Sequence, residues 1–247
     1  DGHFRHCTIP TLQDLFVSAE VHPFAKTGGL ADVSGALPPA LYKLGHDIRV
    51  IMPKYPCTTK AGKGLLELDL ELPGFSGSLF QSELAEGVPV YLIEHDGYYN
   101  REHLYGEPGS DYPDNVERFA YFCRAVLEAA KKLDFKPDII HCNDWHTGLI
   151  PVYLKTLYRK DPGFAQTKTL FSIHNLGYQG NFPYSQLVTT GLDESLFREE
   201  GIEFYGQISF LKGGLIFADT LTTVSPAYSQ EIQTTELGFG MEGILQK

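Results

Sequence analysis

The sequence lacks any apolar run of about 20 residues, the length that a membrane-spanning helix needs. Residues 1–12 have neither the basic segment nor the apolar segment of a secretory signal. Cysteine is scarce, and the four cysteines have neither the spacing of zinc ligands nor that of a disulfide framework. We therefore expect a soluble cytoplasmic protein that binds no membrane and keeps its cysteines as reduced, buried thiols.

Positive charge is also scarce. The chain has 20 Lys and Arg against 31 Asp and Glu, which gives a formal net charge of −11 at pH 7. Because binding to nucleic acid depends on clustered Lys and Arg, the composition argues against a nucleic-acid partner and favours neutral substrates. The 247 residues suffice for one large or two small domains with a sizeable core.

Short apolar segments alternate with segments of helical periodicity. Strands are predicted at residues 15–18, 47–52, 88–94, 138–141, 168–174 and 220–224. Helices are predicted at residues 30–44, 116–133, 147–158, 207–218 and 226–234. This alternation predicts an α/β fold with a Rossmann-like parallel sheet and helices on both faces.

Two segments interrupt the alternation. Residues 64–83 alternate between apolar and polar side chains on either side of Pro73-Gly74, which predicts an antiparallel hairpin inserted after the second strand. Residues 96–115 are rich in Tyr, Gly, Pro and Asp without periodicity, so we predict a long loop there. Loops of that length in compact domains are often functional.

The segment Lys-Thr-Gly-Gly-Leu-Ala-Asp-Val at residues 26–33 lies between the first predicted strand and the first predicted helix. Gly28 and Gly29 would let the backbone approach a ligand, and the helix N-terminus favours a phosphate. The alternative is a glycine pair that only relieves a tight turn, with Lys26 as a solvated charge. The spacing matches neither a P-loop nor the dinucleotide fingerprint, which counts against an oxidoreductase.

Polar residues follow two further predicted strands. Residues 141–146 read His-Cys-Asn-Asp-Trp-His, and residues 174–180 begin with His174 and Asn175. Parallel strands end at one edge of a sheet, so these groups should face a common cleft, where Asp144, Trp145 and His146 suit sugar recognition. The alternatives are that Asp144 only caps the next helix and that His174 is a structural histidine. The spacing does not favour a metal.

Six motifs in one order resemble the amino-terminal half of the bacterial glycogen synthase and plant starch synthase family. They lie at residues 26–33, 141–146, 173–180, 206–212, 224–226 and 240–243. The family is a retaining glucosyltransferase with two Rossmann domains, the GT-B architecture. It moves glucose from ADP-glucose to the non-reducing end of an α-1,4-glucan such as glycogen, without a metal or other cofactor.

The resemblance also implies roles for individual residues. The residues that it places at the donor diphosphate are Lys26, Gly28 and Gly29. The residues that it places around the transferred glucose are Asp32, Asp144, His174 and Asn175, of which the last three are the catalytic candidates. It places Tyr112 close to the same cleft as a substrate-binding residue.

The family's second, nucleotide-binding Rossmann domain has no counterpart before Lys247. We therefore expect residues 1–247 to form a single amino-terminal domain that folds but is inactive alone. Two other functions remain open: a two-Rossmann glycosyltransferase that uses a different nucleotide-sugar, and a non-catalytic glucan-binding module suggested by the Tyr-rich loop. UDP-glucose in place of ADP-glucose would test the first, and micromolar glucan affinity of this chain alone would support the second.

Overall fold

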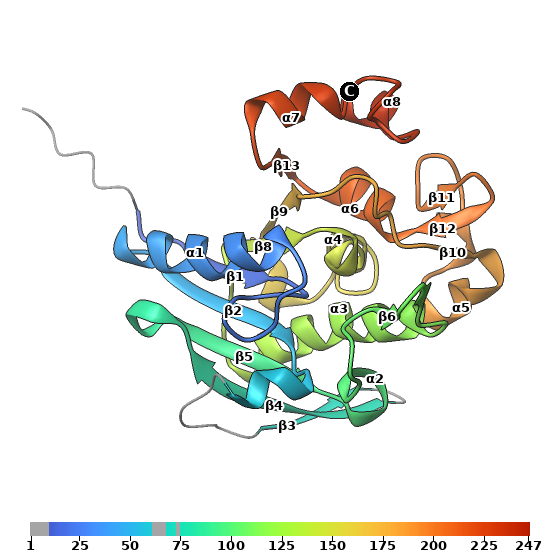
Figure 1. The fold of residues 1–247 in the computed structure, drawn as a ribbon. Coiled ribbons are helices and arrows are strands. Elements are labelled where there is room, and N and C mark those ends of the chain that lie inside the picture. The colour runs from blue at the N-terminus through green and yellow to red at the C-terminus, as the bar shows by residue number, and fades with distance from the viewer. Residues whose placement is uncertain (1–9, 61–67, 73–74) are drawn as a thin grey trace, which may run out of the picture.

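The structure is a computed structural model that describes residues 10–60, 68–72 and 75–247 (Figure 1). Its main sheet has eight strands in the order β13-β9-β8-β1-β2-β5-β4-β3. These strands are β1 Gln13–Val17, β2 Asp47–Pro53, β3 Leu68–Leu72, β4 Phe75–Glu83, β5 Pro89–Glu94, β8 Ile139–Asn143, β9 Lys168–Ile173 and β13 Thr220–Thr223.

The six strands predicted from the alternating pattern are present and pair in parallel. The predicted hairpin is also present, as the antiparallel pair β3–β4. It does not stand apart, because β4 pairs antiparallel with β5 and so extends the sheet at one edge. The sheet is therefore mixed at that edge. Residues 64–67 and the turn at 73–74 lie outside the described residues.

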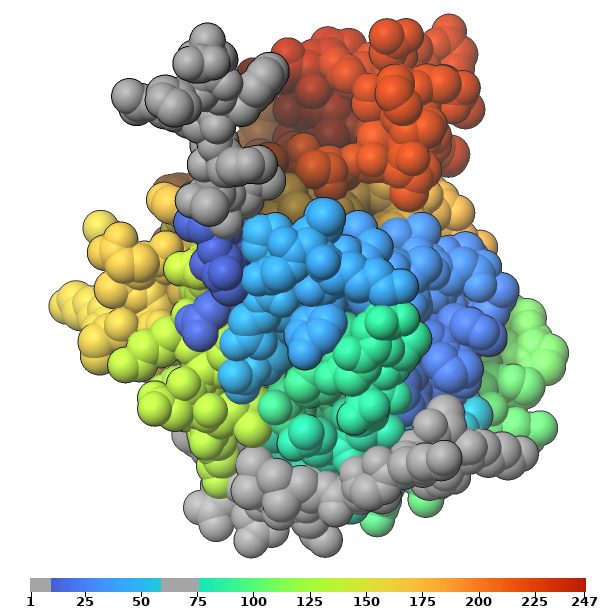
Figure 2. All heavy atoms as spheres, turned by 90° about the vertical axis from the view of Figure 1, so that its left-hand side faces the viewer, coloured from blue at the N-terminus to red at the C-terminus, as the bar shows by residue number. Residues whose placement is uncertain are grey.

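Helices cover both faces of the sheet (Figure 1). Helix α1, Gly29–Lys43, lies on one face, and Figure 2 shows its blue atoms spread across that side of the molecule. Helices α3 Asn115–Lys132, α4 Leu149–Lys155 and α6 Phe210–Phe217 lie on the other face. The chain runs across the sheet in one direction from β1 through β2 to β5, and in the opposite direction from β8 through β9 to β13. Because parallel crossovers are right-handed, the connecting helices of these two halves lie on opposite faces of the sheet.

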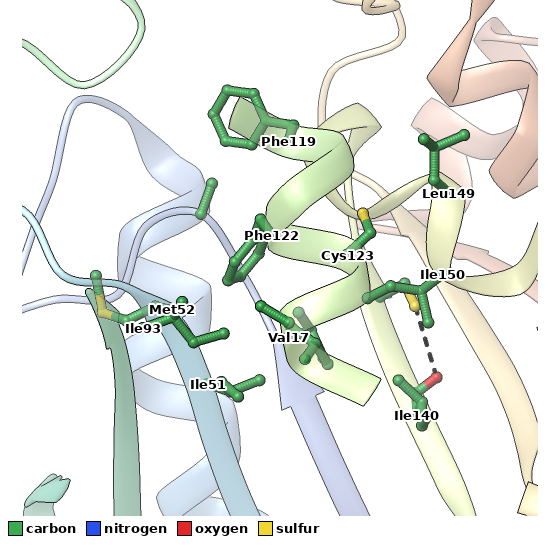
Figure 3. Packing of buried hydrophobic residues seen from close by; sticks show 14 of the residues in the cluster. Val17, Ile51, Met52, Ile93, Phe119, Phe122, Cys123, Ile140, Leu149 and Ile150 are labelled. Carbon is green, nitrogen blue, oxygen red and sulfur yellow. Dashed lines mark hydrogen bonds between the residues drawn. The ribbon is translucent and has the colours of Figure 1, made fainter. Parts of the chain in front are cut away.

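The core lies between α3 and the sheet (Figure 3). Phe119, Phe122 and Cys123 on α3 are fully buried, and the Cys123 thiol donates to the carbonyl oxygen of His146 at 3.3 Å. Central strands of a parallel sheet are covered on both faces, which is why they read as continuous apolar runs such as Ile-Ile at 139–140. The aliphatic side chains of Val17 and Ile51 complete this layer.

The cysteines agree only in part with their prediction. Cys123 and Cys142 are free and buried, and burial raises the pKa of the Cys123 thiol to about 12. Cys57 is exposed, because it lies in a short helical turn after β2. Cys7 lies outside the described residues.

Two further segments differ from their prediction. The expected structureless loop at 96–115 contains a short helix, α2 Asp96–Tyr99, and a ribbon of β6 Gly106–Glu107 with β7 Ser110–Asp111. The helix expected from residue 207 begins at Phe210, because Gln207–Ser209 forms β12 and pairs with two other short strands. Those strands are β10 Asn181–Pro183 and β11 Glu203–Phe204. Tertiary pairing overrides helical periodicity there.

Three helices complete the fold. They are α5 Leu187–Thr190, α7 Pro226–Glu231 and α8 Glu242–Leu245. Helices α4 and α7 are both shorter than the periodicity predicted. In the part of the chain that the structure describes, no helix is long and apolar enough to cross a membrane.

The close approach of α4 to α6 gives a direct test of the packing. A Cβ atom on Gly148 would lie 1.9 Å from the carbonyl oxygen of Phe210, so the backbones would have to move apart. We expect Gly148→Ala to lower the free energy of unfolding by about 1–3 kcal/mol, as overpacking does. Gly243→Ala is the control, because its Cβ would meet nothing within 4 Å. Urea unfolding of both variants measures the difference, and equal stabilities would contradict the packing described here.

Candidate active site

The strand order reverses at β1. The chain first passes through α1 to β2 on one side of β1, and later through α3 to β8 on the other side. In open α/β sheets, ligands bind at the carboxyl ends of the strands where the strand order reverses in this way. Since β1, β8 and β9 are adjacent and parallel, the segments that follow them meet at one edge. Asp144 and His174 both lie there.

The Asp144 carboxylate joins the ends of β8 and β9. Its Oδ1 accepts the backbone N–H of His174 at 2.7 Å and that of Asn175 at 3.3 Å. The side chain makes no capping hydrogen bond to the short helix that follows, so the helix-cap interpretation is wrong. The Asp144 backbone has a φ of 56°, which is unusual for a residue other than glycine. Such strain occurs often at functional sites.

Burial dominates the ionisation of Asp144. It raises the pKa of the carboxyl to about 7, while the N–H groups of His174 and Asn175 lower it and the nearby Glu20 carboxylate raises it further. A buried carboxylate that changes charge near neutral pH is typical of a functional site.

A fixed hydrogen-bond network orients His174. Its Nε2 lies 2.9 Å from Oδ1 of Asn143. The Asn143 amide nitrogen donates to the carbonyl oxygens of Val17 and His141, so Oδ1 must be the acceptor and His174 Nε2 the donor. Burial lowers the pKa of His174 to about 4, so the ring is neutral at pH 7 and its Nδ1 is an acceptor.

Sequence reasoning did not select Asn143 as a site residue. The only signal available was its position at the end of a strand, next to Asp144. Asn175, which was selected, is exposed, and its side-chain oxygen accepts the Gly177 N–H at 3.0 Å. This hydrogen bond is typical of an Asn turn, and it leaves the amide NH₂ group to face solvent or a ligand.

The Gly28–Gly29 turn is organised by the buried carboxylate of Glu20. One oxygen accepts the N–H of Thr27 at 2.5 Å and that of Gly28 at 3.2 Å, and the other accepts the Thr27 hydroxyl at 2.6 Å. Two of the N–H groups in the expected phosphate-binding turn therefore have an internal acceptor. The first turn of α1, from Gly29 onward, supplies the N–H groups for an anion, since a helix start leaves them without intrahelical acceptors.

Nothing within the described chain requires glycine at this turn. A Cβ atom on Gly28 or Gly29 would meet no atom within 4 Å, and Gly28 has an ordinary extended φ of −148°. By contrast, a Cβ on Gly35 would lie 2.4 Å from the carbonyl oxygen of His22. The two glycines thus keep open space in front of the helix start, which favours ligand approach over relief of a tight turn.

The structure pairs Lys26 with Asp32. The Lys26 Nζ lies 2.6 and 2.7 Å from the two carboxylate oxygens, and the side chains are 47% and 56% exposed. An ion pair this exposed contributes little to stability, about 0–1 kcal/mol. Lys26 can therefore exchange this partner for an anionic ligand at low cost.

Tyr112 is not seen to contact the other predicted site residues. Its hydroxyl donates to Glu107 at 3.2 Å, and its ring packs against the guanidinium groups of Arg101 and Arg118. Its assignment as a substrate-binding residue stays a prediction. Tyr105 from the same loop reaches the site instead, because its hydroxyl donates to Glu20 at 2.6 Å.

A buried arginine holds this loop in place. The Arg118 guanidinium, on α3, donates to the carbonyl oxygens of Tyr98 and Leu104 and to the Asn115 side chain. The contacts of Tyr105 and Arg118 bring together residues far apart in sequence, so no local pattern could reveal them.

The predicted sugar contacts of Trp145 and His146 stay a prediction, and the structure shows a packing role for both rings. Both side chains are buried, at 8% and 6% exposure, and their rings stack at 4.1 Å. Trp145 also packs edge-on against Phe119 at 4.8 Å, so the ring belongs to the core. Burial lowers the pKa of His146 to about 3. Asp144, at 7% exposure, is as buried as these two residues, but its carboxylate has backbone N–H partners at the strand ends.

Comparison with known proteins shows which class this fold and site define. The structure resembles the catalytic domain of starch synthase IV from Arabidopsis thaliana, solved with ADP and acarbose bound. The TM-score is 0.86 at 34% sequence identity, over 96% of this chain and 50% of that one. This is half of the two-Rossmann architecture of a glycosyltransferase.

The sequence comparisons specify the family. The model of the starch synthase catalytic domain matches residues 15–247, and the chain belongs to that family. It is 51% identical to the glycogen synthase of Syntrophotalea carbinolica and 49% identical to glycogen synthase 2 of Geobacter sulfurreducens. Each alignment covers 94% of this chain and 49% of the relative. The chain thus spans about half the length of the curated relatives that it matches.

The raised pKa of Asp144 predicts a pH-dependent stability. Because the folded-state pKa of about 7 exceeds the ordinary 3.8, the wild-type protein loses stability from this group as the pH rises between these values. We expect Asp144→Asn, which keeps the acceptor oxygen, to be more stable than wild type at pH 8 and equally stable near pH 4.

Unfolding free energies from pH 4 to pH 8 test this prediction. Taking the difference between variant and wild type cancels the contributions of the other buried groups. The exposed carboxyl of Asp96 provides the control, since Asp96→Asn removes a charge that water already solvates. A difference for Asp144→Asn that is constant with pH would contradict the burial argument.

Proposed function

We propose that these residues form the amino-terminal domain of a glycogen synthase. The complete enzyme would transfer glucose from ADP-glucose to the non-reducing end of an α-1,4-glucan, with retention of configuration. The observation that carries the proposal is the meeting of Asp144, His174 and the open Gly28–Gly29 turn at the point of strand reversal. The family membership and the ADP and acarbose bound to the Arabidopsis relative support it.

The charges of the site suit glucosyl transfer. As the bond from glucose to diphosphate breaks, negative charge grows on the leaving group and positive charge grows on the sugar. The start of α1, a helix of 15 residues, and the Lys26 ammonium can stabilise the diphosphate. The Asp144 carboxylate provides negative charge for the sugar side.

The neutral His174 ring suits the sugar hydroxyls. Its Nδ1 can accept a hydroxyl hydrogen bond, while Asn143 holds the ring in one orientation. The amide NH₂ of Asn175 can donate to a hydroxyl oxygen. A site built from fixed donors and acceptors does not have to reorganise during the reaction. Asp144, His174 and Asn175 stay the proposed catalytic residues, and Asp32 a proposed binding residue.

Among residues 10–60, 68–72 and 75–247, no group of three or more His, Cys, Asp or Glu side chains could hold a metal ion. The proposed location of the protein is the cytoplasm, where a reduced Cys57 is expected to persist.

The direct test is transfer of radiolabelled glucose to glycogen. Because the relatives are about twice as long, the assay uses this chain and, in parallel, the protein at the length of its relatives. We expect the longer protein to elongate glycogen with ADP-glucose and the 247-residue chain to show no turnover. Elongation with UDP-glucose in preference to ADP-glucose would favour the second candidate, a related transferase with another donor. Absence of transfer from either donor would contradict the proposal.

Lys26 provides the sharper test of the donor site. If its ammonium makes a charge-assisted hydrogen bond to the diphosphate, Lys26→Ala in the longer protein should raise the donor KM about tenfold. The acceptor KM should not change. Lys43→Ala is a matched control, since Lys43 forms a comparable exposed ion pair with Glu86 at the other end of α1. An unchanged donor KM in Lys26→Ala would remove Lys26 from this role.

A further inference from the structure

Two aromatic residues are held in a backbone conformation that aromatic residues rarely adopt. Tyr205 and Gly206 have φ values of 48° and 79°, and Phe239 and Gly240 have 49° and 83°. Tyr205 and Gly206 are the two residues that join β11 to β12, where Phe204 pairs with Gln207. Two-residue hairpin loops with two positive φ angles strongly favour Asn or Gly at the first position. A bulky residue there is strained.

Core packing does not explain these aromatic residues. The Tyr205 side chain is 82% exposed and that of Phe239 is 55% exposed. The strained backbone therefore presents two large rings to solvent rather than to the interior. An aromatic residue at a positive φ goes against the local backbone preference, and here no burial of the ring compensates for it. Such an uncompensated conflict indicates a function.

Tyr205 lies beside the loop that carries Phe239, and Phe239 lies beside the candidate site. A Cβ atom on Gly240 would lie 3.1 Å from Cε2 of Tyr205, so the Tyr205 ring borders the loop that carries Phe239. A Cβ on Gly177 would lie 3.7 Å from Cζ of Phe239, and the backbone oxygen of Phe239 accepts a hydrogen bond from Gln179 at 3.1 Å. In Figure 1 the β11–β12 hairpin likewise lies beside the loop before α8.

We propose that Tyr205 and Phe239 form an aromatic platform on which glucosyl units of the α-glucan stack, beyond the unit at Asp144 and His174. That the ligand is an α-glucan rests on the proposed function. An aromatic face covers the apolar face of a sugar ring, and the Tyr205 hydroxyl can hydrogen-bond a sugar hydroxyl. The platform continues from the His174–Asn175 turn, because Phe239 contacts that turn at Gly177.

The surrounding charge favours a neutral glucan over a nucleotide at this platform. The Glu203 carboxylate accepts the Gly206 N–H at 2.7 Å, and the Glu242 side chain lies against Gly238, next to Phe239. Carboxylates on both sides would repel a phosphate group, and the whole chain has a formal net charge of −11. A sugar chain carries no charge and meets no such repulsion.

Replacement of each aromatic residue by Asn tests the effect of the ring on glucan binding without destabilising the fold. Asn tolerates a positive φ, so Tyr205→Asn and Phe239→Asn should keep or raise the melting temperature while removing the rings. Each should weaken glucan affinity about three- to tenfold, the effect of one aromatic contact. Electrophoresis of this chain in gels that contain glycogen measures the affinity, because the many chain ends of glycogen strengthen weak binding.

Tyr42→Gln is the matched control, since Tyr42 is 40% exposed on the outer face of α1, in a helix that Gln tolerates. We expect equal retardation of the wild type and of this control, and three- to tenfold weaker affinity, seen as reduced retardation, in both Asn variants. The platform is overturned if the wild type is not retarded, or if all variants are retarded equally. It is also overturned if gel filtration shows a dimer that Tyr205→Asn dissociates without a change in glucan affinity.

Failure of the platform and failure of the proposed function give different results. The platform is tested by glucan binding to this chain, whereas the function is tested by glucose transfer in the longer protein. Transfer without an effect of the Asn variants on binding overturns only the platform. Ring-dependent glucan binding without transfer overturns only the function and supports a glucan-binding module.

Discussion

One carboxylate oxygen, Oδ1 of Asp144, joins the ends of two neighbouring strands. It accepts the backbone N–H groups of His174 and Asn175, and His174 in turn binds Asn143, the residue before Asp144. This closed set of contacts fixes the start of the His174–Gly180 turn relative to β8. The position of the proposed sugar site, and of the platform that borders the same turn, depends on it. The same burial that makes these hydrogen bonds strong raises the pKa of the Asp144 carboxyl.

A second buried carboxylate, that of Glu20, organises the other side of the site. It holds the backbone of Thr27 and Gly28 before α1, and it accepts the hydroxyl of Tyr105 from the long loop. The two carboxylates are close enough for Glu20 to raise the pKa of Asp144. Both therefore favour cationic or strongly hydrogen-bonding partners between them. The developing positive charge on a transferred sugar has this character.

The elements that the sequence predicted best are those with strong periodicity and deep burial. All six parallel strands, the hairpin and α3 were predicted, because apolar runs and helical spacing reflect burial that every protein of this architecture shares. The predictions failed where distant pairing decides the structure. Gln207–Ser209 forms a strand because β10 and β11 lie beside it, and the loop at 96–115 is held by the buried Arg118.

The sequence by itself determined the α/β class and the strand ends at which Asp144 and His174 lie, because those depend on local apolar patterns. The family resemblance added the proposed roles of Lys26 and the glycine pair. Only the tertiary structure decided that the Trp145 ring packs against His146 and Phe119. It alone also joined Glu20 to Tyr105, 85 residues away. The physical reason is that side-chain burial and hydrogen-bond partners depend on segments distant in sequence, whose approach no local pattern encodes.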